Sequence, residues 1–412
     1  MLNLRKITYF LLISMLFWPL MSYITFGLLG LRSISFYYTF IAIFYGILFI
    51  FHKKKIKVPK ELYYLIFFII FEFVWAFFNG DIIRRGIIAV LFDNPSIATF
   101  FIVLIIYNTR FSDRFFKKAI FIFKITIILA AIVSIIQFFF PRFLNAYILY
   151  RENFDFFKRG IYQQPRTSIF GYIDLNSLGL SFMSIVALIS GYLLYIKKRI
   201  FLIFLFLGGL TAFLSNARYV MVAFIIISIQ YIFYKKVFFK GAFKYAILVL
   251  VLLLALYGVF SYLGYDYEAW FNNRLFAEGS IKETTRFKAI GNFLILFPKY
   301  YLVGNGGKIY SDEIVSLSRA VGSSHIHVGY LSHLVSYGIV GCFFLYGFWF
   351  ILVKKLYRKA KQTNYWGSFF AFLTFLWAFA TFSYSSIFFY GLIFALVFDK
   401  YYSDIYISNS YK

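Results

Sequence analysis

Three of the four histidines of this chain lie close together, at His325, His327 and His333. The segment that holds them runs on to Gly341, and it follows the longest polar stretch of an otherwise mostly apolar sequence. Imidazole titrates near pH ~6.5, so histidine is the side chain best suited to move protons at neutral pH. This placement indicates a reaction centre on one face of a membrane, reached from both water and lipid.

Helical spacing separates the three histidines. Tyr330 and Leu331 follow His327 at i+3 and i+4, so these three share one helical face. His325 and His333 lie off that face, and two histidines that hold a metal from one helix stand at i and i+4. The spacing therefore predicts no zinc site, and we expect no metal and no other cofactor. The simpler interpretation of His327 is an interfacial polar tip.

Two arginines are the candidate anion ligands. Arg218 follows Ser-Asn-Ala in a very short connection between apolar spans, and Arg286 begins an apolar segment of a long loop. Each has a simpler interpretation, Arg218 as an arginine that extends to lipid headgroups and Arg286 as a solvated surface charge. A guanidinium can bind phosphate through two hydrogen bonds, so both arginines on one pyrophosphate would stabilise a leaving group.

Membrane helices must position these residues. Hydrophobic residues make up 62% and aromatic residues 25% of the 412 positions, and a helix needs about 20 mainly apolar residues to cross a bilayer. We predict an all-α polytopic membrane protein, a single membrane domain over residues 1–412 with about 12 transmembrane helices. The predicted spans lie near residues 8–30, 35–51, 62–78, 94–107, 119–140, 174–196, 200–214, 218–234, 243–263, 327–353, 366–381 and 384–399.

The net charge of +26 follows this topology. With both termini in the cytoplasm, the internal segments carry 25 of the 42 basic residues and 4 of the 16 acidic ones. The external segments carry 16 basic and 11 acidic residues, as expected where positive loops stay inside. The charge therefore does not indicate a nucleic-acid partner. We expect the first span to be retained, because no small-x-small cleavage site follows it.

Two long external loops are predicted, over residues 141–173 and 264–326. Within the second, residues 284–297 are too short to span a bilayer but apolar enough to lie at its surface. We expect this loop to cap a cavity, with Arg274 and His325 among the substrate-binding residues.

Other polar residues have less specific interpretations. Arg166 and Asn176 flank the entry to the sixth span, where Asn176 is expected to cap the helix whether or not it also binds substrate. Glu72 is an acid within the third span, and such residues are functional hypotheses by default. A hydrogen bond from Glu72 to another helix is the alternative. The single cysteine, Cys342, excludes an intrachain disulfide.

The order of these motifs resembles the O-antigen ligase and Wzy-type polysaccharide polymerase superfamily. An Arg…Gly…Asn segment enters one helix, Ser-x-x-Arg follows the next, and a long external loop carries an arginine near its middle. The segment H-x-x-Y-L-x-x-L-x-x-x-G-I-V-G then begins at His327. The resemblance covers roughly residues 166–355. The chain departs from the family pattern at Val328, where asparagine is common, and at Ser336, where an acid is common.

The resemblance implies a metal-independent, GT-C-like glycosyltransferase at the outer face of a bacterial plasma membrane. Its donor would be a polyprenyl-pyrophosphate-linked glycan, with Arg218 and Arg286 on the pyrophosphate and His327 on the acceptor side near Tyr330. A chain-length regulator and a flippase are the implied protein partners.

Three functions remain open on sequence alone. A polymerase would extend lipid-linked repeat units into O-antigen, capsular or exopolysaccharide, and a ligase would transfer the glycan to the lipid A core. A flippase or other secondary transporter for lipid-linked glycans is the alternative of another class. Transporters usually place polar groups near mid-membrane, whereas most polar residues of this chain lie in external loops.

Overall fold

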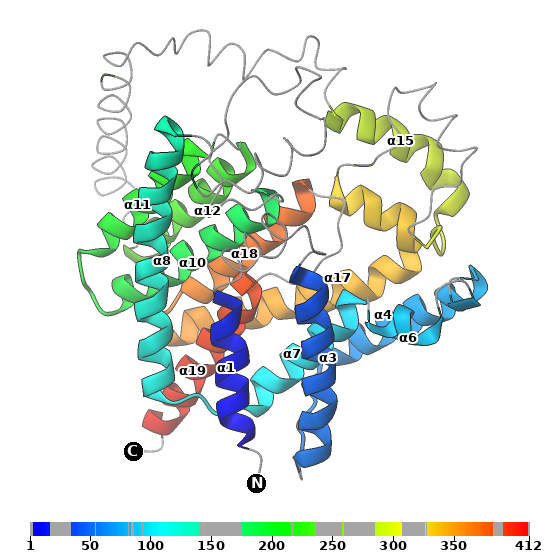
Figure 1. The fold of residues 1–412 in the computed structure, drawn as a ribbon, viewed down its shortest axis with the longest axis horizontal. Coiled ribbons are helices and arrows are strands. Elements are labelled where there is room, and N and C mark those ends of the chain that lie inside the picture. Colours follow the sequence, from blue (N-terminus) through cyan, green and yellow to red (C-terminus); the bar gives the residue numbers. More distant parts are fainter. Residues whose placement is uncertain are drawn as a thin grey trace.

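The computed structural model describes a helical bundle (Figure 1). The described residues are 3–16, 34–53, 55–80, 82–83, 86–92, 94–140, 143, 175–215, 218–235, 258, 285–306, 326, 328–381 and 390–410. The helices are α1 Leu4–Leu16, α3 Ile34–His52, α4 Glu61–Phe78, α6 Ile87–Phe92, α7 Pro95–Asn108, α8 Asp113–Phe139, α10 Leu175–Tyr195, α11 Phe201–Leu214, α12 Arg218–Lys235, α15 Thr285–Tyr300, α17 Gly329–Thr363, α18 Gly367–Thr381 and α19 Tyr390–Ser410.

These helices are those of a membrane protein. By length and composition, α4, α17 and the Asp113–Gln137 part of α8 can each cross a bilayer, and six further described helical stretches are apolar but shorter. Most helices lie where the sequence predicted spans, and α15 confirms the helix expected near residues 284–297. The predicted span 243–263 falls almost entirely outside the described residues, and the number of spans stays a prediction.

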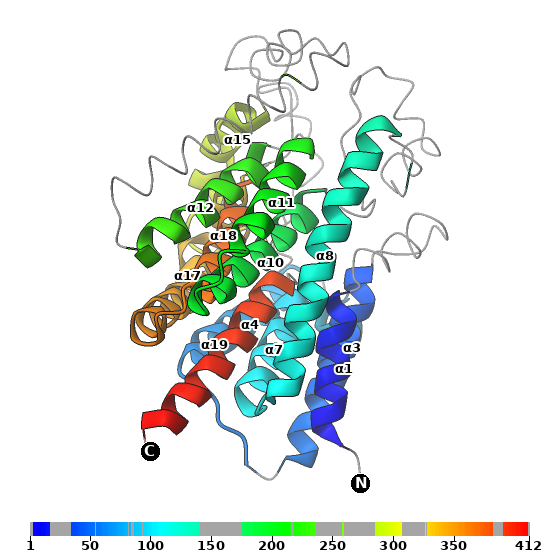
Figure 2. The ribbon, with the colours of Figure 1, turned by 90° about the vertical axis from the view of Figure 1, so that its left-hand side faces the viewer.

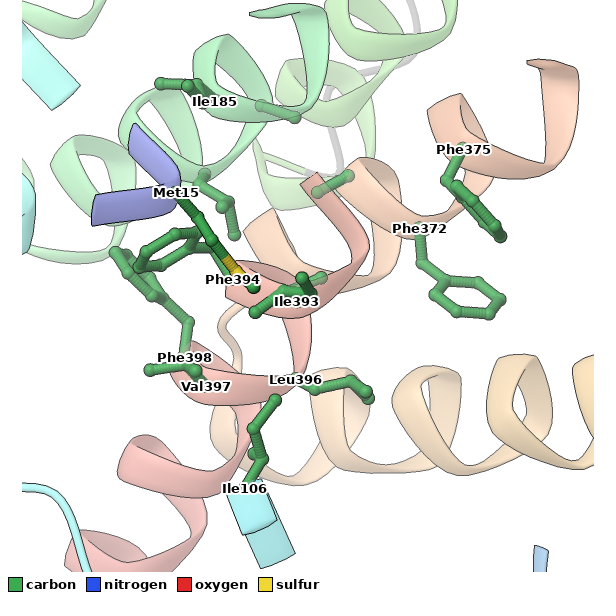
Figure 3. Close-up of a cluster of buried hydrophobic side chains, with 14 of the residues drawn as sticks. Met15, Ile106, Ile185, Phe372, Phe375, Ile393, Phe394, Leu396, Val397 and Phe398 are labelled. Carbon is green, nitrogen blue, oxygen red and sulfur yellow. The ribbon is translucent and has the colours of Figure 1, made fainter. Parts of the chain in front are cut away.

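The core forms around α10. This helix packs against α8, α11, α12, α18 and α19, and it approaches α18 closely because Gly191 and Gly367 face each other. Small residues let membrane helices come this near. Figure 3 shows large apolar side chains of the buried core that come from several helices, among them Met15 of α1, Phe372 of α18 and Phe394 of α19.

Both chain termini lie at the same end of the bundle (Figures 1 and 2). Ion pairs join α17 to two other helices. Lys355 Nζ lies 2.5 Å from Glu61 Oε1, and Lys359 Nζ lies 2.7 Å from Asp399 Oδ2. These pairs tie α17 to α4 and α19. Helix α19 continues well past the predicted end of the last span at residue 399, because its charged residues can pair within the helix, as Lys400 and Asp404 do.

Helix α17 departs most from the prediction of one span over residues 327–353. At Gly338 the backbone has φ 61° and ψ −172°, which divides the element into a half-helix (residues 329–337) and a long helix (residues 339–363). Only glycine adopts this conformation readily. The sequence prediction of one continuous helix is therefore wrong at this point.

The loop after α15 satisfies the backbone groups that the break exposes. The amides of Asn305 and Gly306 donate to the carbonyls of Val335 and Ser336, each at 2.9 Å. The amides of Ile339 and Val340 donate to the carbonyls of Tyr301 and Leu302, at 2.8 and 3.1 Å. Unpaired backbone groups are costly in a bilayer, so the broken helix depends on this loop.

We predict that Gly338→Ala destabilises the protein far more than Gly80→Ala. Both glycines have positive φ, but a Cβ at Gly80 would meet open space, whereas one at Gly338 would collide with the backbone of Leu302 and Val303. Strain alone costs about 1 kcal/mol, and the collision adds to it. Thermal unfolding of the detergent-purified variants measures the difference, and equal transitions would contradict the prediction.

Candidate functional site

Of the predicted catalytic and substrate-binding residues, Tyr330 is described with its side chain. Arg218 is the first residue of α12 and Arg286 is the second residue of α15. Asn176 follows the first residue of α10. The side chains of these three are outside the described part of the structure. Four further predicted residues also lie outside it: Arg166, Arg274, His325 and His327.

Helix α18 brings the starts of α12 and α17 to the same level. The hydroxyl of Tyr330 donates to the Leu376 carbonyl at 2.9 Å. The indole nitrogen of the next residue, Trp377, donates to the Tyr219 carbonyl at 3.0 Å. Tyr219 directly follows Arg218, and Tyr330 is one helical turn beyond His327. Two segments that are distant in sequence are thus held by adjacent residues of α18.

A small apolar cluster joins α15 to the same place. Its buried members are Ala289 and Leu296 of α15, Val335 of the half-helix, and Ile326. Ile326 directly precedes His327, and Ala289 lies one turn beyond Arg286. Figure 1 shows α15 lying over the first part of α17. The segments that carry Arg218, Arg286 and His327 therefore converge through α18 and the half-helix.

Tyr330 and Leu331 use different neighbours within this arrangement. Leu331 packs against the α15 cluster, whereas Tyr330 bonds to α18. Leu334 follows His327 at i+7, so its spacing also predicts it on that face, but it lines a separate pocket between α4 and α17. Tyr330, Leu331 and Leu334 therefore do not form one contact surface.

An apolar groove of about 690 Å³ begins at Tyr330. The groove is lined by residues of α12, α17 and α18, among them Trp366 and Trp377, which are eleven residues apart. At a helical rise of about 1.5 Å per residue, the lined part of the chain near α18 is about 16 Å long. The other lining residues are Ile226, Ile229, Tyr357, Phe369, Phe370, Leu373 and Leu376. A flexible hydrocarbon chain fits these walls better than a polar ligand does.

His333 lies inside the bend of α17, with only 2% of its surface exposed. Its Nδ1 is 3.3 Å from the hydroxyl of Tyr346, which also donates to the Tyr330 carbonyl at 3.3 Å. Tyr346 belongs to the long helix, so these bonds join the two parts of α17. This histidine has a packing role, consistent with its expected place off the His327 face.

Sequence reasoning did not find Leu376, Trp377 and Tyr346. They lie from 13 to 158 residues from the hydrogen-bond partners described above, and nothing in their local spacing indicates those contacts. Within the described ranges, no three histidine, cysteine, aspartate or glutamate side chains are grouped so that they could hold a metal.

Residues 201–346 match the family model described as O-antigen ligase, Wzy_C. This match supports the O-antigen ligase superfamily for residues 201–346. The resemblance predicted from the motifs is thereby confirmed. A search of curated proteins and a search of solved structures each found no match.

The O-antigen ligase segment extends from the start of α11 into the long helix of α17. It contains Arg218, Arg286, His327 and Tyr330. It also contains the break at Gly338 and the loop that satisfies it. Helix α18 lies outside the segment, yet it holds Tyr219 and Tyr330. The matched segment thus covers Arg218, Arg286, His327 and Tyr330, but neither Arg166 and Asn176 nor helix α18.

We expect Tyr330→Phe to lower the stability of the O-antigen ligase-type site by about 1 kcal/mol, the usual net value of one hydrogen bond. The change removes the donor to the Leu376 carbonyl and keeps the ring. Tyr357→Phe is the matched control, since Tyr357 lines the same groove. Thermal unfolding of both variants in detergent provides the measurement. A transition for Tyr330→Phe no lower than that of the control would contradict the assigned bond.

Proposed function

We propose that the protein polymerises polyprenyl-pyrophosphate-linked oligosaccharide repeat units into O-antigen, capsular or exopolysaccharide. The reaction would take place at the outer face of a bacterial plasma membrane, with both chain termini in the cytoplasm. The observation that carries the proposal is the joint anchoring of Tyr219 and Tyr330 on α18 in a chain that matches the O-antigen ligase family over residues 201–346. This anchoring supports a site to which Arg218, next to Tyr219, and His327, one turn before Tyr330, both contribute.

The proposed reaction is a direct displacement. A hydroxyl of the acceptor sugar attacks the anomeric carbon of the donor, and the bond from that carbon to the pyrophosphate oxygen breaks. Arg218 and Arg286 hold the departing polyprenyl pyrophosphate and stabilise the charge that develops on it. His327 accepts the hydroxyl proton or orients the acceptor. The glycosyl-pyrophosphate bond supplies the driving force, so the reaction needs no nucleotide.

The remaining predicted residues would contact substrate around this centre. Arg166, Arg274 and His325 would come from the predicted external loops, and Asn176 from the start of α10. The apolar groove that begins at Tyr330 would take the first isoprene units of the donor. A polyprenyl chain in a bilayer is already out of water, so the groove would mainly orient the chain by packing against it. A chain-length regulator and a flippase would act before or after this step.

Ligation of the glycan to the lipid A core is the second candidate function. The description of the matched family favours it. We favour polymerisation because Val328 and Ser336 replace the asparagine and the acid that are common in the family, as expected for a divergent member. The two activities differ only in the acceptor, so a direct assay separates them.

Reconstitution tests the proposed activity. Purified protein in liposomes, supplied with lipid-linked repeat units on the accessible side, should yield longer glycans and free polyprenyl pyrophosphate. Gel analysis of the glycans and chromatography of the lipid measure both products. Transfer to added lipid A core with no self-extension would instead support ligation. Transport of the substrate without either product would support the flippase alternative and exclude a transferase.

Substitution of the two arginines tests the pyrophosphate contacts. We expect Arg218→Ala and Arg286→Ala each to lower kcat about a hundredfold or more, the usual effect of removing one group that stabilises transition-state charge. Lys288→Ala, two residues from Arg286 on α15, and Arg199→Ala, in the connection before α11, are the basic controls. His327→Ala should reduce turnover comparably. Full activity in an arginine variant would remove that residue from the proposed site.

A bulky residue in the groove tests where the lipid chain binds. Leu373→Trp should raise the KM for the lipid-linked donor about tenfold, since its indole would occupy the groove, while kcat at saturation changes little. Ile203→Trp is the control, because Ile203 is exposed on α11 and does not line the groove. An unchanged KM in Leu373→Trp would place the lipid chain elsewhere.

A further inference from the structure

Lys124 is a charged residue within an apolar stretch of α8, and the proposed reaction does not use it. No other residue between Ala119 and Gln137 is charged, and Lys124 lies about three turns beyond the start of the helix. An ionisable side chain inside a membrane helix is costly, and it usually pairs with an opposite charge. Among the described residues, no carboxylate forms an ion pair with Lys124. The preference for basic residues in internal loops does not explain a lysine at this position.

The ammonium group of Lys124 lies beside α11. Its Nζ is over the ring of Phe204, 6.0 Å from the centroid, which is within the range of a cation–π contact. Phe204 is buried, whereas Lys124 is half-buried. Helices α8 and α11 pack against each other, and Figure 2 shows them side by side. The positive charge of Lys124 is therefore held at the edge of the contact between α8 and α11.

A basic turn leads into α11. Residues 196–200 join α10 to α11 and carry three exposed basic side chains, those of Lys197, Lys198 and Arg199. The turn is tight, since Lys197 has φ 57° and the amides of Lys197 and Lys198 donate to carbonyls of the last turn of α10, each at 2.9 Å. Phe204 is three residues beyond the first residue of α11, or about 5 Å along the helix axis. The basic turn therefore lies close to the ammonium group of Lys124.

The surrounding helices supply no negative charge to balance these residues. Helices α1, α10 and α12 pack against α8 or α11, and neither they nor α11 contain an aspartate or glutamate. The one acid of α8 is Asp113, which accepts a hydrogen bond from Tyr401 at 3.0 Å. In the described structure no side chain caps α11, so the positive end of its dipole adds to the local potential. The place where α8 meets the start of α11 therefore has an excess of positive charge.

We propose that Lys124 and the basic turn of residues 197–199 bind the phosphate of an anionic phospholipid. The lipid belongs to the leaflet at the start of α8, which lies at the end of the bundle where both chain termini are (Figure 1). In the proposed topology this is the cytoplasmic leaflet, whose anionic lipids attract basic groups. The inference goes beyond the proposed function and does not depend on it.

The chemistry of the site fits such a lipid at both ends. Ammonium and guanidinium groups only donate hydrogen bonds, and phosphate oxygens accept them. A lysine inside a membrane helix extends its charged end toward the headgroups, and the Cβ atoms of α8 tilt toward the start of that helix. The acyl chains would lie along exposed apolar side chains of α8, those of Phe121, Ile125 and Ile128. One phospholipid can therefore meet both the charged and the apolar parts of this surface.

Lipid titration followed by native mass spectrometry of the detergent-purified protein tests the proposal. The Kd for phosphatidylglycerol should rise at least about fivefold in Lys124→Met, the usual contribution of one basic residue near an anionic lipid surface. Lys124→Arg keeps the charge and should stay within about twofold of the wild type. Changing all three basic residues of the turn to glutamine should raise the Kd by at least about fivefold.

A matched control removes the same charge elsewhere. Lys354, Arg358 and Lys361 are exposed basic residues of α17, and their change to glutamine should leave the Kd within about twofold. Phosphatidylglycerol should also raise the thermal transition of the wild type more than that of Lys124→Met, because a ligand that binds the folded state stabilises it.

The source of the phosphate is tested with two further probes. Phosphatidylcholine, which has no net charge, should bind at least about fivefold more weakly than phosphatidylglycerol, and inorganic phosphate should not displace the bound lipid. Equal affinity for the two lipids, or displacement by inorganic phosphate, would overturn the proposal. Wild-type affinity in Lys124→Met would also overturn it. If Lys124→Met does not fold, wild-type affinity in the glutamine variant of the turn overturns it.

Discussion

The need to pair every backbone polar group inside an apolar environment governs the arrangement of this protein. Helices meet that need internally, so a break in a helix must be compensated by other chain. At Gly338 the compensation comes from residues 301–306, which exchange four hydrogen bonds with α17. This exchange locks α15 to α17. It also sets the direction in which the half-helix runs toward the external side of the proposed topology.

The break allows one element to serve two purposes. The long helix of α17 packs along α4 and α18 and carries Lys355 and Lys359, which pair with acids of α4 and α19. The half-helix does not continue along the axis of the long helix, because the backbone changes direction at Gly338. Its Tyr330 contacts α18 and its Leu331 contacts α15. A straight helix could not do both, because its side chains would all project from one axis. A bent helix can therefore combine a rigid membrane anchor with a separately oriented site.

Helix α18 is the common support of the candidate site. It contacts α10 at glycine-to-glycine distance, and its residues Leu376 and Trp377 bind the starts of α17 and α12. The helix carries none of the residues that the sequence suggested for chemistry. Its contribution is to bring together segments more than a hundred residues apart.

The sequence by itself determined the class of the protein, the places of most helices and the family. Runs of apolar residues of membrane length specify helices locally, and the ordered motifs from Arg166 to Gly341 predicted the superfamily that the match over residues 201–346 confirms. Only the tertiary structure decided that α17 is broken at Gly338 and that Glu72 bonds to Asn94. It also decided that Tyr330 and Tyr219 hydrogen-bond to adjacent residues of α18. Each of these depends on partners distant in the chain. Local periodicity carries no information about such partners. The sequence around Gly338 or Glu72 has the same apolar pattern as the sequence of an unbroken helix without these contacts.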